Sequence, residues 1–331
     1  MKVMICGGNS CSQIIEIVYN EMLRREWEVH YLPTRARPKS ADNLYLMDQL
    51  IIEVRSFRPD LILWMMCSLD CRDGVCDRLR TASPNSILVC HSFDDPYVID
   101  QYGSPWVRGF DRAVTCSLEC LSWYEDRGVK AICLYPPVDS SLHGAANRDP
   151  SKACDISFAV TNVYPKSRYP DVLLGRSDII SALDEEGFNL FLYGPWQGSS
   201  NSLGSERGVP HLQHLHKGVV AYKDMPTVFS SSKINLNSHV RPSSFGYLNE
   251  RVFTSLAAGG FMLTDHVSGL ESTFKLGTHL DAWSDLDELI EKCRYYLHHD
   301  DERLRIAREG QEYVLGKFSS QCFVDGIIGL M

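Results

Sequence analysis

The sequence predicts an α/β protein built from two Rossmann-like, doubly wound parallel-sheet domains. Short, continuously apolar segments alternate with segments whose apolar residues recur at helical spacing, which is typical of a parallel sheet covered on both faces. This alternation runs twice along the chain, on either side of a polar stretch at residues 140–153. A length of 331 residues suits two domains of ordinary size.

The first series of elements begins at residue 2. The opening apolar run stops at Gly7-Gly8-Asn9-Ser10, so it predicts a strand followed by a tight turn. Ile14, Val18 and Met22 recur on one face of the next segment and predict a helix. By the same reasoning we expect strands at 2–6, 28–32, 60–64, 86–90, 113–116 and 131–134, and helices at 12–25, 44–57 and 119–127.

Pro136-Pro137-Val138-Asp139 interrupts this rhythm, and the Gly, Asn, Asp, Pro and Ser residues that follow predict an interdomain linker. A second series then predicts strands at 154–160, 189–193 and 234–237, and helices at 177–186, 225–231, 285–296 and 301–317. We therefore expect an N-terminal domain at 1–139, a linker at 140–153, a C-terminal domain at 154–318, and a tail at 319–331 that packs back on the N-terminal domain.

Residues 249–265 form the most informative segment. They read as an amphipathic helix, a turn of small residues at 257–260, and a buried strand that ends at Asp265. A loop rich in Gly, Ser and Pro precedes the helix, so the free N–H groups of its first turn suit a phosphate. The alternative is an ordinary αβ unit with no ligand.

Composition narrows the function classes. A net charge of −9 argues against a general nucleic-acid or anionic-membrane binder. Ten of the twelve cysteines precede residue 155, and no signal peptide or membrane span is apparent, which favours reduced thiols in the cytoplasm. Cys67, Cys71 and Cys76 lack the spacing of a zinc site, so small buried side chains are the favoured interpretation.

The second half of the chain resembles GT-B glycosyltransferases, and more narrowly the spore-maturation (CgeB-like) glycosyl transferase group 1 family. In the first half the resemblance is weaker, at Arg58–Leu63 and at the strand that ends in His91–Pro96. The segments that carry it in the second half follow in the family's order: Asp155–Phe158, Leu192–Gly194, Tyr222–Pro226, Lys233–Asn237, Asn249–Phe253, Ala258–Thr264, Asp285–Leu289 and Tyr295–Leu297.

This resemblance implies a GT-B fold, with two domains facing across a cleft. It implies metal-independent transfer of a sugar from a nucleotide-diphosphate donor, a UDP-sugar above all, to an acceptor hydroxyl. No prosthetic group is expected. The C-terminal domain would hold the donor, and the N-terminal domain would shape the acceptor side. The acceptor stays open between a small molecule, a protein, a glycan and a nucleotide.

One position departs from the family pattern. The family has Arg-x-Phe-Glu in the helix after residue 249, where the Glu binds ribose hydroxyls, whereas this chain has Arg251-Val-Phe-Thr254. Glu250 lies one turn earlier on the same helix face, so it is a candidate to replace that Glu. An unusual donor is the alternative.

Donor-binding candidates cluster around the same helix. Arg251 is the first choice for the diphosphate, because a guanidinium grips phosphate oxygens with two parallel hydrogen bonds; a surface arginine is the alternative. Arg241 and His239 follow, weighed against plain loop polarity, and Lys223 is weighed against a solvated lysine. The resemblance adds three further positions to the donor site: Asn249, Gly194 and Tyr222.

Acceptor-side candidates follow the fourth strand of the first domain. Asp94, Asp95 or His91 is positioned to take the proton of an acceptor hydroxyl. The alternative for the carboxylates is an Asp-Asp-Pro turn. Gly7, Gly8, Asn9 and Ser10 form a loop expected to line the acceptor site; they lack the full dinucleotide fingerprint.

Two further groups of residues and two further functions stay open. Trp106, Trp123 and Trp196 offer flat faces for sugar rings, although core packing is the favoured role except at Trp196. His211, His214 and His216 are interpreted as polar loop residues rather than a metal site. A nucleotide-sugar epimerase or hydrolase, and a non-catalytic binding protein, are the alternatives to a transferase.

Overall fold

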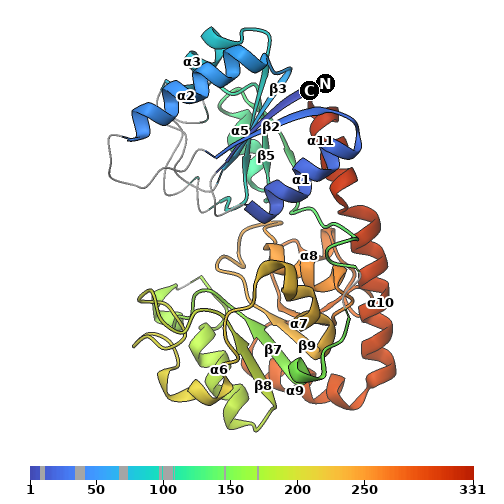
Figure 1. The fold of residues 1–331 in the computed structure, drawn as a ribbon. Coiled ribbons are helices and arrows are strands. Elements are labelled where there is room, and N and C mark those ends of the chain that lie inside the picture. The colour runs from blue at the N-terminus through green and yellow to red at the C-terminus, as the bar shows by residue number, and fades with distance from the viewer. Residues whose placement is uncertain are drawn as a thin grey trace. The chain divides into compact units, whose positions relative to one another are not determined.

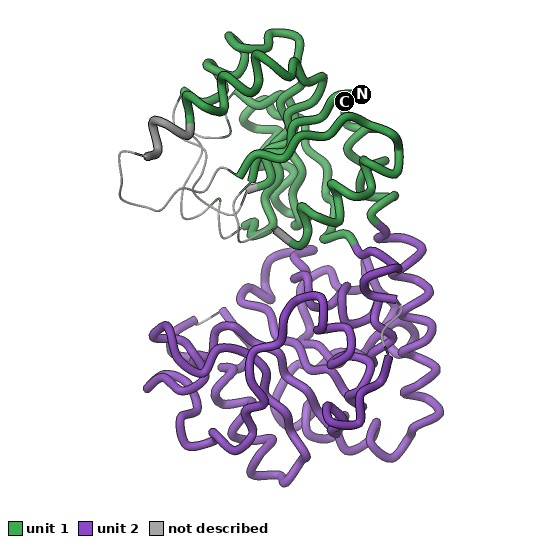
Figure 2. The backbone as a smooth tube through the Cα atoms, in the orientation of Figure 1, with its two compact units in different colours: residues 1–137, 320–331 green, residues 138–319 purple. Residues whose placement is uncertain are grey.

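The computed structural model describes residues 1–7, 12–33, 42–66, 74–96, 99, 107, 109–144, 147–169 and 171–331. The chain divides into two compact units (Figure 2). Unit 1 comprises Met1–Pro137 and Ser320–Met331, and unit 2 comprises Val138–Ser319. Each unit contains one sheet in which all described strand pairs are parallel, which confirms the predicted fold class. Within the described ranges, no helix combines the length and the apolar character needed to cross a membrane.

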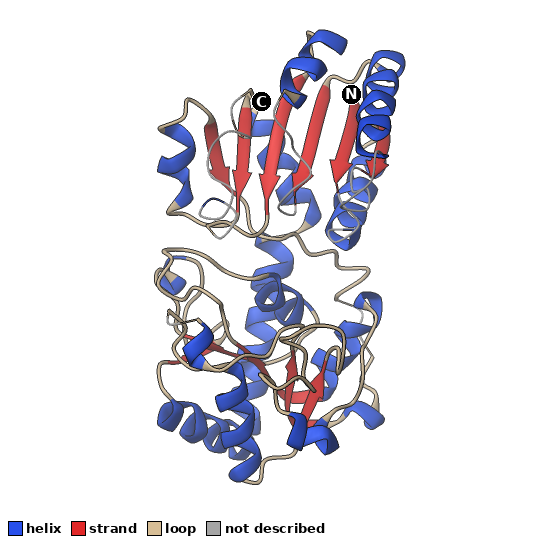
Figure 3. Ribbon diagram, turned by 90° about the vertical axis from the view of Figure 1, so that its left-hand side faces the viewer, coloured by secondary structure: helices blue, strands red, loops and turns tan. Residues whose placement is uncertain are grey.

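Unit 1 is a six-stranded sheet in the order β2-β1-β3-β4-β5-β6, whose arrows all point the same way in Figure 3. The strands follow the apolar runs of the sequence to within two residues at either end. They are β1 (Lys2–Gly7), β2 (Glu28–Pro33), β3 (Leu61–Met66), β4 (Ile87–Ser92), β5 (Arg112–Thr115) and β6 (Lys130–Cys133).

Helices cover both faces of this sheet, because successive strand residues point to opposite sides. Val3 and Ile5 pack with residues of α1 and α11, whereas Met4 and Cys6 pack with residues of α2, α3 and α5. The helices are α1 (Ser12–Arg24), α2 (Asp42–Phe57), α3 (Val75–Ala82), α5 (Cys120–Glu125) and α11 (Ser320–Leu330).

Helix α11 belongs to unit 1 although the whole of unit 2 separates it from β6 in the sequence. It lies beside α1 (Figure 1), and Arg25, which directly follows α1, forms an ion pair with Asp325 of α11 at 2.7 Å. Its apolar side chains Phe323, Val324 and Ile327 are at most 3% exposed. Helix α11, which has eleven residues, therefore completes the core of unit 1.

Unit 2 is a five-stranded sheet in the order β11-β10-β9-β7-β8. Strand β8 lies on one side of β7 and β9 on the other, so the strand order reverses between β7 and β9. Crevices at such a switch point, at the carboxyl ends of the strands, are where open α/β sheets bind ligands. The strands are β7 (Cys154–Ala159), β8 (Leu190–Tyr193), β9 (Ser232–Asn237), β10 (Met262–Asp265) and β11 (Asp281–Trp283).

Strand β9 shows how the sequence places polar groups at this switch point. Ile234 and Leu236 enter the main core of unit 2. Asn235 and Asn237 alternate with them and face the other side of the sheet, where Asn235 Nδ2 donates to Phe229 O at 2.9 Å. The helices around this sheet are α6 (Arg176–Glu185), α7 (Met225–Ser231), α8 (Glu250–Ala257), α9 (Leu286–His298) and α10 (Asp300–Lys317).

Helix α8 and the strand after it form the αβ unit that residues 249–265 predict. Asn249 occupies the N-cap position, and its side chain makes no cap hydrogen bond to the first turn. Gly259, at φ 75°, ends the helix in the left-handed conformation that glycine favours. Gly260 leaves room for Asn235, whose Nδ2 would lie 2.4 Å from an added Cβ.

Residues 140–153, expected to form a linker, belong to unit 2. Asp139 organises this segment: its Oδ1 accepts from Ser141 N at 2.8 Å, and its backbone N donates to His143 Nδ1 at 3.0 Å. Val138 N also donates to Phe318 O at 2.9 Å. Local side-chain-to-backbone bonds thus hold residues 139–143, where the segment of irregular composition begins.

Candidate functional site

The candidate site lies at the carboxyl edge of the unit 2 sheet. It is formed by the segments that follow β7, β9 and β10 and by the first residues of α6 and α8. Two of these strands, β7 and β9, are the pair between which the strand order reverses. The site contains several residues predicted from the sequence and others that the sequence did not single out.

Arg176, the first residue of α6, is only 5% exposed, and its guanidinium donates three hydrogen bonds. Its Nε donates to Ser238 Oγ at 2.9 Å, its Nη2 to Ser238 O at 2.9 Å, and its Nη1 to Asn162 O at 2.8 Å. The guanidinium carbon lies 5.0 Å from the centre of the Tyr164 ring. The guanidinium is therefore fixed in place by neutral acceptors and an aromatic face.

Arg251 is the second guanidinium of the site. Its Nη1 donates to Asn237 Oδ1 at 2.6 Å, and the same oxygen accepts from Asn249 Nδ2 at 3.2 Å. Burial, and next the positive charge of Arg176, lower the pKa of Arg251 to about 10. Among the described residues neither Arg176 nor Arg251 has a carboxylate within the 4.0 Å of an ion pair.

A chain of hydrogen bonds links Arg251 to the end of β10. Asn237 Nδ2 donates to Thr264 Oγ1 at 3.0 Å, and Thr264 Oγ1 donates to Asp265 Oδ1 at 3.1 Å. Asp265 in turn holds His239, through its backbone N at 2.8 Å and its Nδ1 at 2.6 Å. The structure thus brings together three predicted donor-site residues, Arg251, Asn249 and His239.

Glu250 and Tyr222, both predicted for the donor site, also meet. Tyr222 Oη donates to Glu250 Oε1 at 2.6 Å and lies 3.3 Å from His143 Nε2. Burial, followed by the charge of Glu250, raises the pKa of Tyr222. Thr254 Oγ1 instead lies 3.2 Å from the backbone oxygen of Glu250, to which it donates. Because Thr254 is also buried, the structure argues against a direct contact between its hydroxyl and a ligand.

The remaining donor-site candidates are Gly194, Arg241 and Lys223. Gly194 follows β8 and approaches the segment after β7 so closely that an added Cβ would lie 1.8 Å from Val160 O. Arg241 is half-buried in the loop before α8, and Lys223 is exposed in the short 3₁₀ helix Tyr222–Asp224. Gly194 thus shapes the edge of the sheet through its backbone.

In unit 1, Asp95 and His91 are buried within the fold. Asp95 accepts from Ser92, Thr115 and Tyr124 at 2.7, 2.7 and 2.8 Å. Burial raises its pKa to about 6. His91 is 0% exposed, its ring centre lies 3.7 Å from that of Phe93, and burial lowers its pKa to about 3. Groups enclosed in this way are poorly suited to take a proton from an acceptor, so burial counts against both predictions.

Asp94 is exposed and is the member of the predicted acceptor-side group that solvent reaches. Gly7 ends β1 where an added Cβ would lie 2.9 Å from Met65 O, so its role in the structure is close packing. The other members of the predicted acceptor-side loop, Gly8, Asn9 and Ser10, lie outside the described residues.

The predicted histidine and tryptophan groups separate in the structure. His214 Nε2 lies 3.3 Å from Asp184 Oδ1, and His216 Nε2 lies 2.8 Å from Gly194 O. Within the described ranges no three metal-ligating side chains gather in one place. Trp196 is half-buried and packs against the core, and Arg127 stacks on Trp123 at 3.8 Å. Trp106, Cys67 and Cys71 lie outside the described residues, and Cys76 is buried.

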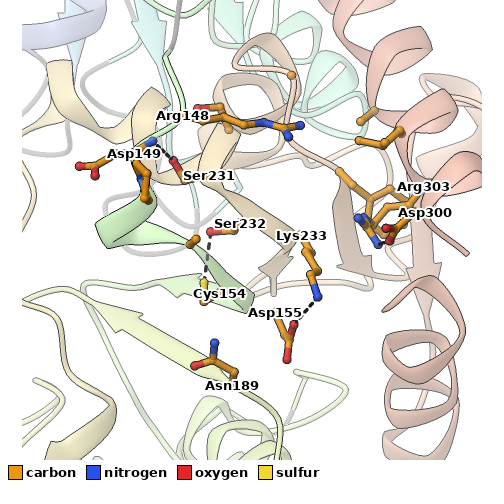
Figure 4. A pocket seen from close by; sticks show the side chains of 17 residues that line it. Arg148, Asp149, Cys154, Asp155, Asn189, Ser231, Ser232, Lys233, Asp300 and Arg303 are labelled. Atoms are coloured by element: carbon orange, nitrogen blue, oxygen red, sulfur yellow. Dashed lines mark hydrogen bonds and ion pairs between the residues drawn. The ribbon is translucent and has the colours of Figure 1, made fainter. Parts of the chain in front are cut away.

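A cavity of 640 Å³ opens at the opposite, amino-terminal edge of the unit 2 sheet (Figure 4). Cys154 and Ser232 begin the strands that border it, and Cys154 Sγ lies 3.4 Å from Ser232 Oγ. Two of its cations are already paired: exposed Lys233 with Asp155 at 2.8 Å, and buried Arg303 with Asp300 at 2.6 Å. The arginine pair at the carboxyl edge is therefore the better candidate for an anionic ligand.

Comparison with known proteins identifies the architecture. Residues 176–328 match a family model described as glycosyl transferase-like. Anabaena HepE in complex with UDP superposes with a TM-score of 0.67 at 12% identity over 100% of both chains. Sucrose-phosphate synthase from Thermosynechococcus elongatus gives 0.70 at 12% identity, over 99% of this chain and 98% of that one. The chain has the GT-B fold.

The resemblance of this GT-B chain to glycosyltransferases, predicted from the sequence, is thereby confirmed, whereas the narrower CgeB-like resemblance stays a prediction. The lipopolysaccharide galactosyltransferase WaaB superposes with a TM-score of 0.59 at 11% identity over 100% of both chains. At such identities these likenesses establish the fold. No curated protein matches the sequence.

Sequence reasoning missed Arg176, Asn162 and Ser238. Arg176 lies one residue before the start that we predict for its helix, so it reads as an ordinary polar residue. One signal is visible in retrospect: Gly175-Arg176 opens the helix that follows the first strand of the second series. The backbone oxygens of Asn162 and Ser238 carry no sequence signal.

Proposed function

We propose that this protein is a glycosyltransferase that takes a sugar from a UDP-sugar and transfers it to an acceptor hydroxyl. The observation that carries this proposal is the pair of guanidiniums at the switch point, Arg176 and Arg251. Like charges placed together with no carboxylate in ion-pair distance, among the described residues, favour a dianionic ligand. A pyrophosphate between them meets that requirement.

In this proposal unit 2 binds the donor. The bond between the anomeric carbon and the diphosphate oxygen breaks, and a bond to the acceptor oxygen forms. The two arginines and the uncapped start of α8 stabilise the negative charge that the departing UDP gains. This charge is neutralised without a metal ion. The acceptor proton leaves to a base or to the departing diphosphate, according to whether the anomeric configuration inverts or is retained.

Unit 1 would supply the acceptor side, with Asp94 as its candidate polar group. The solved relatives support the choice of donor, since HepE structures contain UDP, UDP with glucose, and UDP-glucose. Glu250 and Tyr222 are the proposed contacts for the ribose in place of Thr254. The free cysteines among the described residues suit a cytoplasmic protein, which is part of the same proposal.

A thermal-shift panel of nucleoside diphosphates tests the proposal. UDP is expected to raise the melting temperature, and Arg251→Ala to weaken UDP binding about 10- to 100-fold, as for the loss of one or two charge-assisted hydrogen bonds. Arg294→Ala is the matched control, because Arg294 lies on the same unit but pairs with Glu186. A protein that no nucleoside diphosphate stabilises would contradict the proposal.

A non-catalytic nucleotide-sugar-binding protein is the second candidate. Thr254 in place of a glutamate, and the burial of His91 and Asp95, favour it. Mass spectrometry after incubation with mixed UDP-sugars separates the possibilities. Transfer gives a glycosylated acceptor, whereas an epimerase or hydrolase changes the UDP-sugar with no acceptor added. A binding protein returns the UDP-sugar unchanged.

A further inference from the structure

Three buried polar atoms at the carboxyl edge of unit 2 have no hydrogen-bond partner among the described residues. They are His239 Nε2, Asn249 Oδ1 and Tyr164 Oη. An unsatisfied buried polar group destabilises the folded state, so native structures retain few of them. Three in one region favour a ligand that satisfies them when it binds.

The first two atoms are hydrogen-bond acceptors. The carboxylate of Asp265 can only accept, so the 2.6 Å contact places the proton of a singly protonated His239 ring on Nδ1. Its Nε2 then presents a lone pair. Asn249 Nδ2 donates to Asn237 Oδ1, which leaves Oδ1 as the unused end of the amide. Phosphate oxygens are acceptors as well, so these two atoms need hydroxyl groups.

Their location ties them to the proposed donor site. His239 directly follows Ser238, whose two oxygens hold Arg176, and Asn249 directly precedes α8 and Arg251. Tyr164 lies under the Arg176 guanidinium. Acceptors beside a diphosphate site match a donor that carries hydroxyl groups next to its diphosphate.

We propose that His239 Nε2 and Asn249 Oδ1 accept hydrogen bonds from hydroxyl groups of the sugar that the donor carries, and that Asp265 is the positioning residue for His239. This inference rests on the proposed function and deepens it. It assigns selection of the sugar to these two acceptors and leaves the diphosphate to Arg176 and Arg251.

Two variants of the full chain separate the two nitrogens of His239. His239→Asn retains an amide near Nδ1, within reach of Asp265, and removes the acceptor at Nε2. His239→Gln places an amide near Nε2. The measurement is the ratio of the Kd for a UDP-sugar to the Kd for UDP, over a panel of UDP-glucose, UDP-galactose, UDP-N-acetylglucosamine and UDP-xylose.

We expect His239→Asn to raise this ratio about 5- to 10-fold for at least one sugar, as for the loss of one hydrogen bond. His239→Gln should keep the ratio within about twofold of wild type. Asp265→Asn should raise it as well, because an amide can donate to Nδ1 and so move the ring proton to Nε2. Melting temperatures identify a variant that fails to fold, and the Gln variant then carries the comparison.

Equal losses for UDP and for every UDP-sugar would overturn the inference, because His239 would then act on the diphosphate or on the fold. An unchanged ratio in His239→Asn for the whole panel would overturn it too. Both outcomes leave the proposed function standing, since UDP still binds to wild type. A wild-type protein that binds no nucleoside diphosphate would instead overturn the proposed function and this inference together.

Discussion

At the residue scale, the side chains of Arg176 and Arg251 raise each other's free energy. The positive charge of Arg176 is the second cause, after burial, that lowers the pKa of Arg251. The fold offsets this repulsion with neutral acceptors, three for Arg176 and one for Arg251. A dianion bound between the two guanidiniums would relieve the repulsion, so ligand binding should raise the stability of unit 2.

His91 and Asp95 predict an unusual pH dependence for unit 1. Below about pH 6.5 His91 is protonated in the unfolded chain, whereas in the folded chain it stays unprotonated until about pH 3. His91 therefore makes the folded state less stable as the pH is lowered through this range. Between pH 6 and pH 3.8 Asp95 is protonated in the folded chain but not in the unfolded chain. Asp95 therefore makes the folded state more stable as the pH is lowered through this range. Each slope is about 1.4 kcal/mol per pH unit, and the two nearly cancel.

Removing one of these two groups should therefore reveal the pH dependence of stability that the other one causes. We expect His91→Leu to make unit 1 more stable relative to wild type as the pH falls from 6 to 4, and Asp95→Asn to do the reverse. Hydrogen exchange of β3 and β4 amides, corrected for intrinsic rates, reports unit 1 alone. Parallel profiles for wild type and both variants would show that neither group titrates as its burial requires.

Single residues also show what the sequence can and cannot predict about a site. Arg251 could be predicted, because a guanidinium at a helix start after a Gly-rich loop is a local pattern. The pairing of His239 with Asp265 spans 26 positions and joins the ends of two strands. Such a contact depends on which strands are neighbours, and apolar periodicity does not state the strand order. The burial of His91 and Asp95, which the sequence did not reveal, depends on the same unknown.

At the element scale, the connection after β8 depends on Gly194. Its φ is 144°, and an added Cβ would lie 1.8 Å from Val160 O. Gly198, four residues on, has a similar φ of 124° but nothing within 4 Å of an added Cβ. The two glycines thus share a backbone conformation that L side chains rarely adopt and differ in the space around them.

Alanine at these two positions should have unequal effects. Gly194→Ala is expected to destabilise unit 2 by about 3 kcal/mol or more, from strain together with a backbone clash, whereas Gly198→Ala should cost about 1 kcal/mol from strain alone. Thermal melting of both variants gives the comparison. Similar melting temperatures would mean that the segment after β7 moves aside without cost.

The elements that sequence patterns predicted best are those with long apolar periods or runs. Helices α7 and α10 and most strands begin and end within two residues of expectation. Strand β11 has three residues, Asp281–Trp283, which is too short for a period to show. Helix α11 falls in a segment predicted only as a tail, although its apolar residues do recur at helical spacing. Its partner, the face of β1 and α1, lies some 300 residues earlier, beyond any local pattern.

At the scale of the whole molecule, the two units depend differently on residues 320–331. All residues of the proposed diphosphate site lie in unit 2, whereas four buried side chains of α11 complete the core of unit 1: Phe323, Val324, Ile327 and Leu330. Burying these four contributes roughly 6–12 kcal/mol, comparable with the entire stability of a domain.

A chain that stops at Ser319 should therefore lose unit 1 and keep unit 2. We expect amides of β1 and β3 to lose their protection from hydrogen exchange, while UDP affinity stays within about threefold of the full chain. Substituting Cys322, which is exposed on α11, by Ser is the control and should change neither property. Loss of UDP binding on truncation would show that unit 2 needs unit 1 to hold its site.

The return of α11 to the first sheet also sets an order of events during synthesis on the ribosome. Unit 2 is complete once residue 319 has left the exit tunnel, whereas unit 1, although translated first, waits for the last helix to cover the apolar face of β1 and β3. That face stays without its final cover while more than 180 intervening residues are translated. At about 5–20 residues per second this is an interval of roughly 10–40 s, in which a nascent-chain chaperone has an apolar surface to bind.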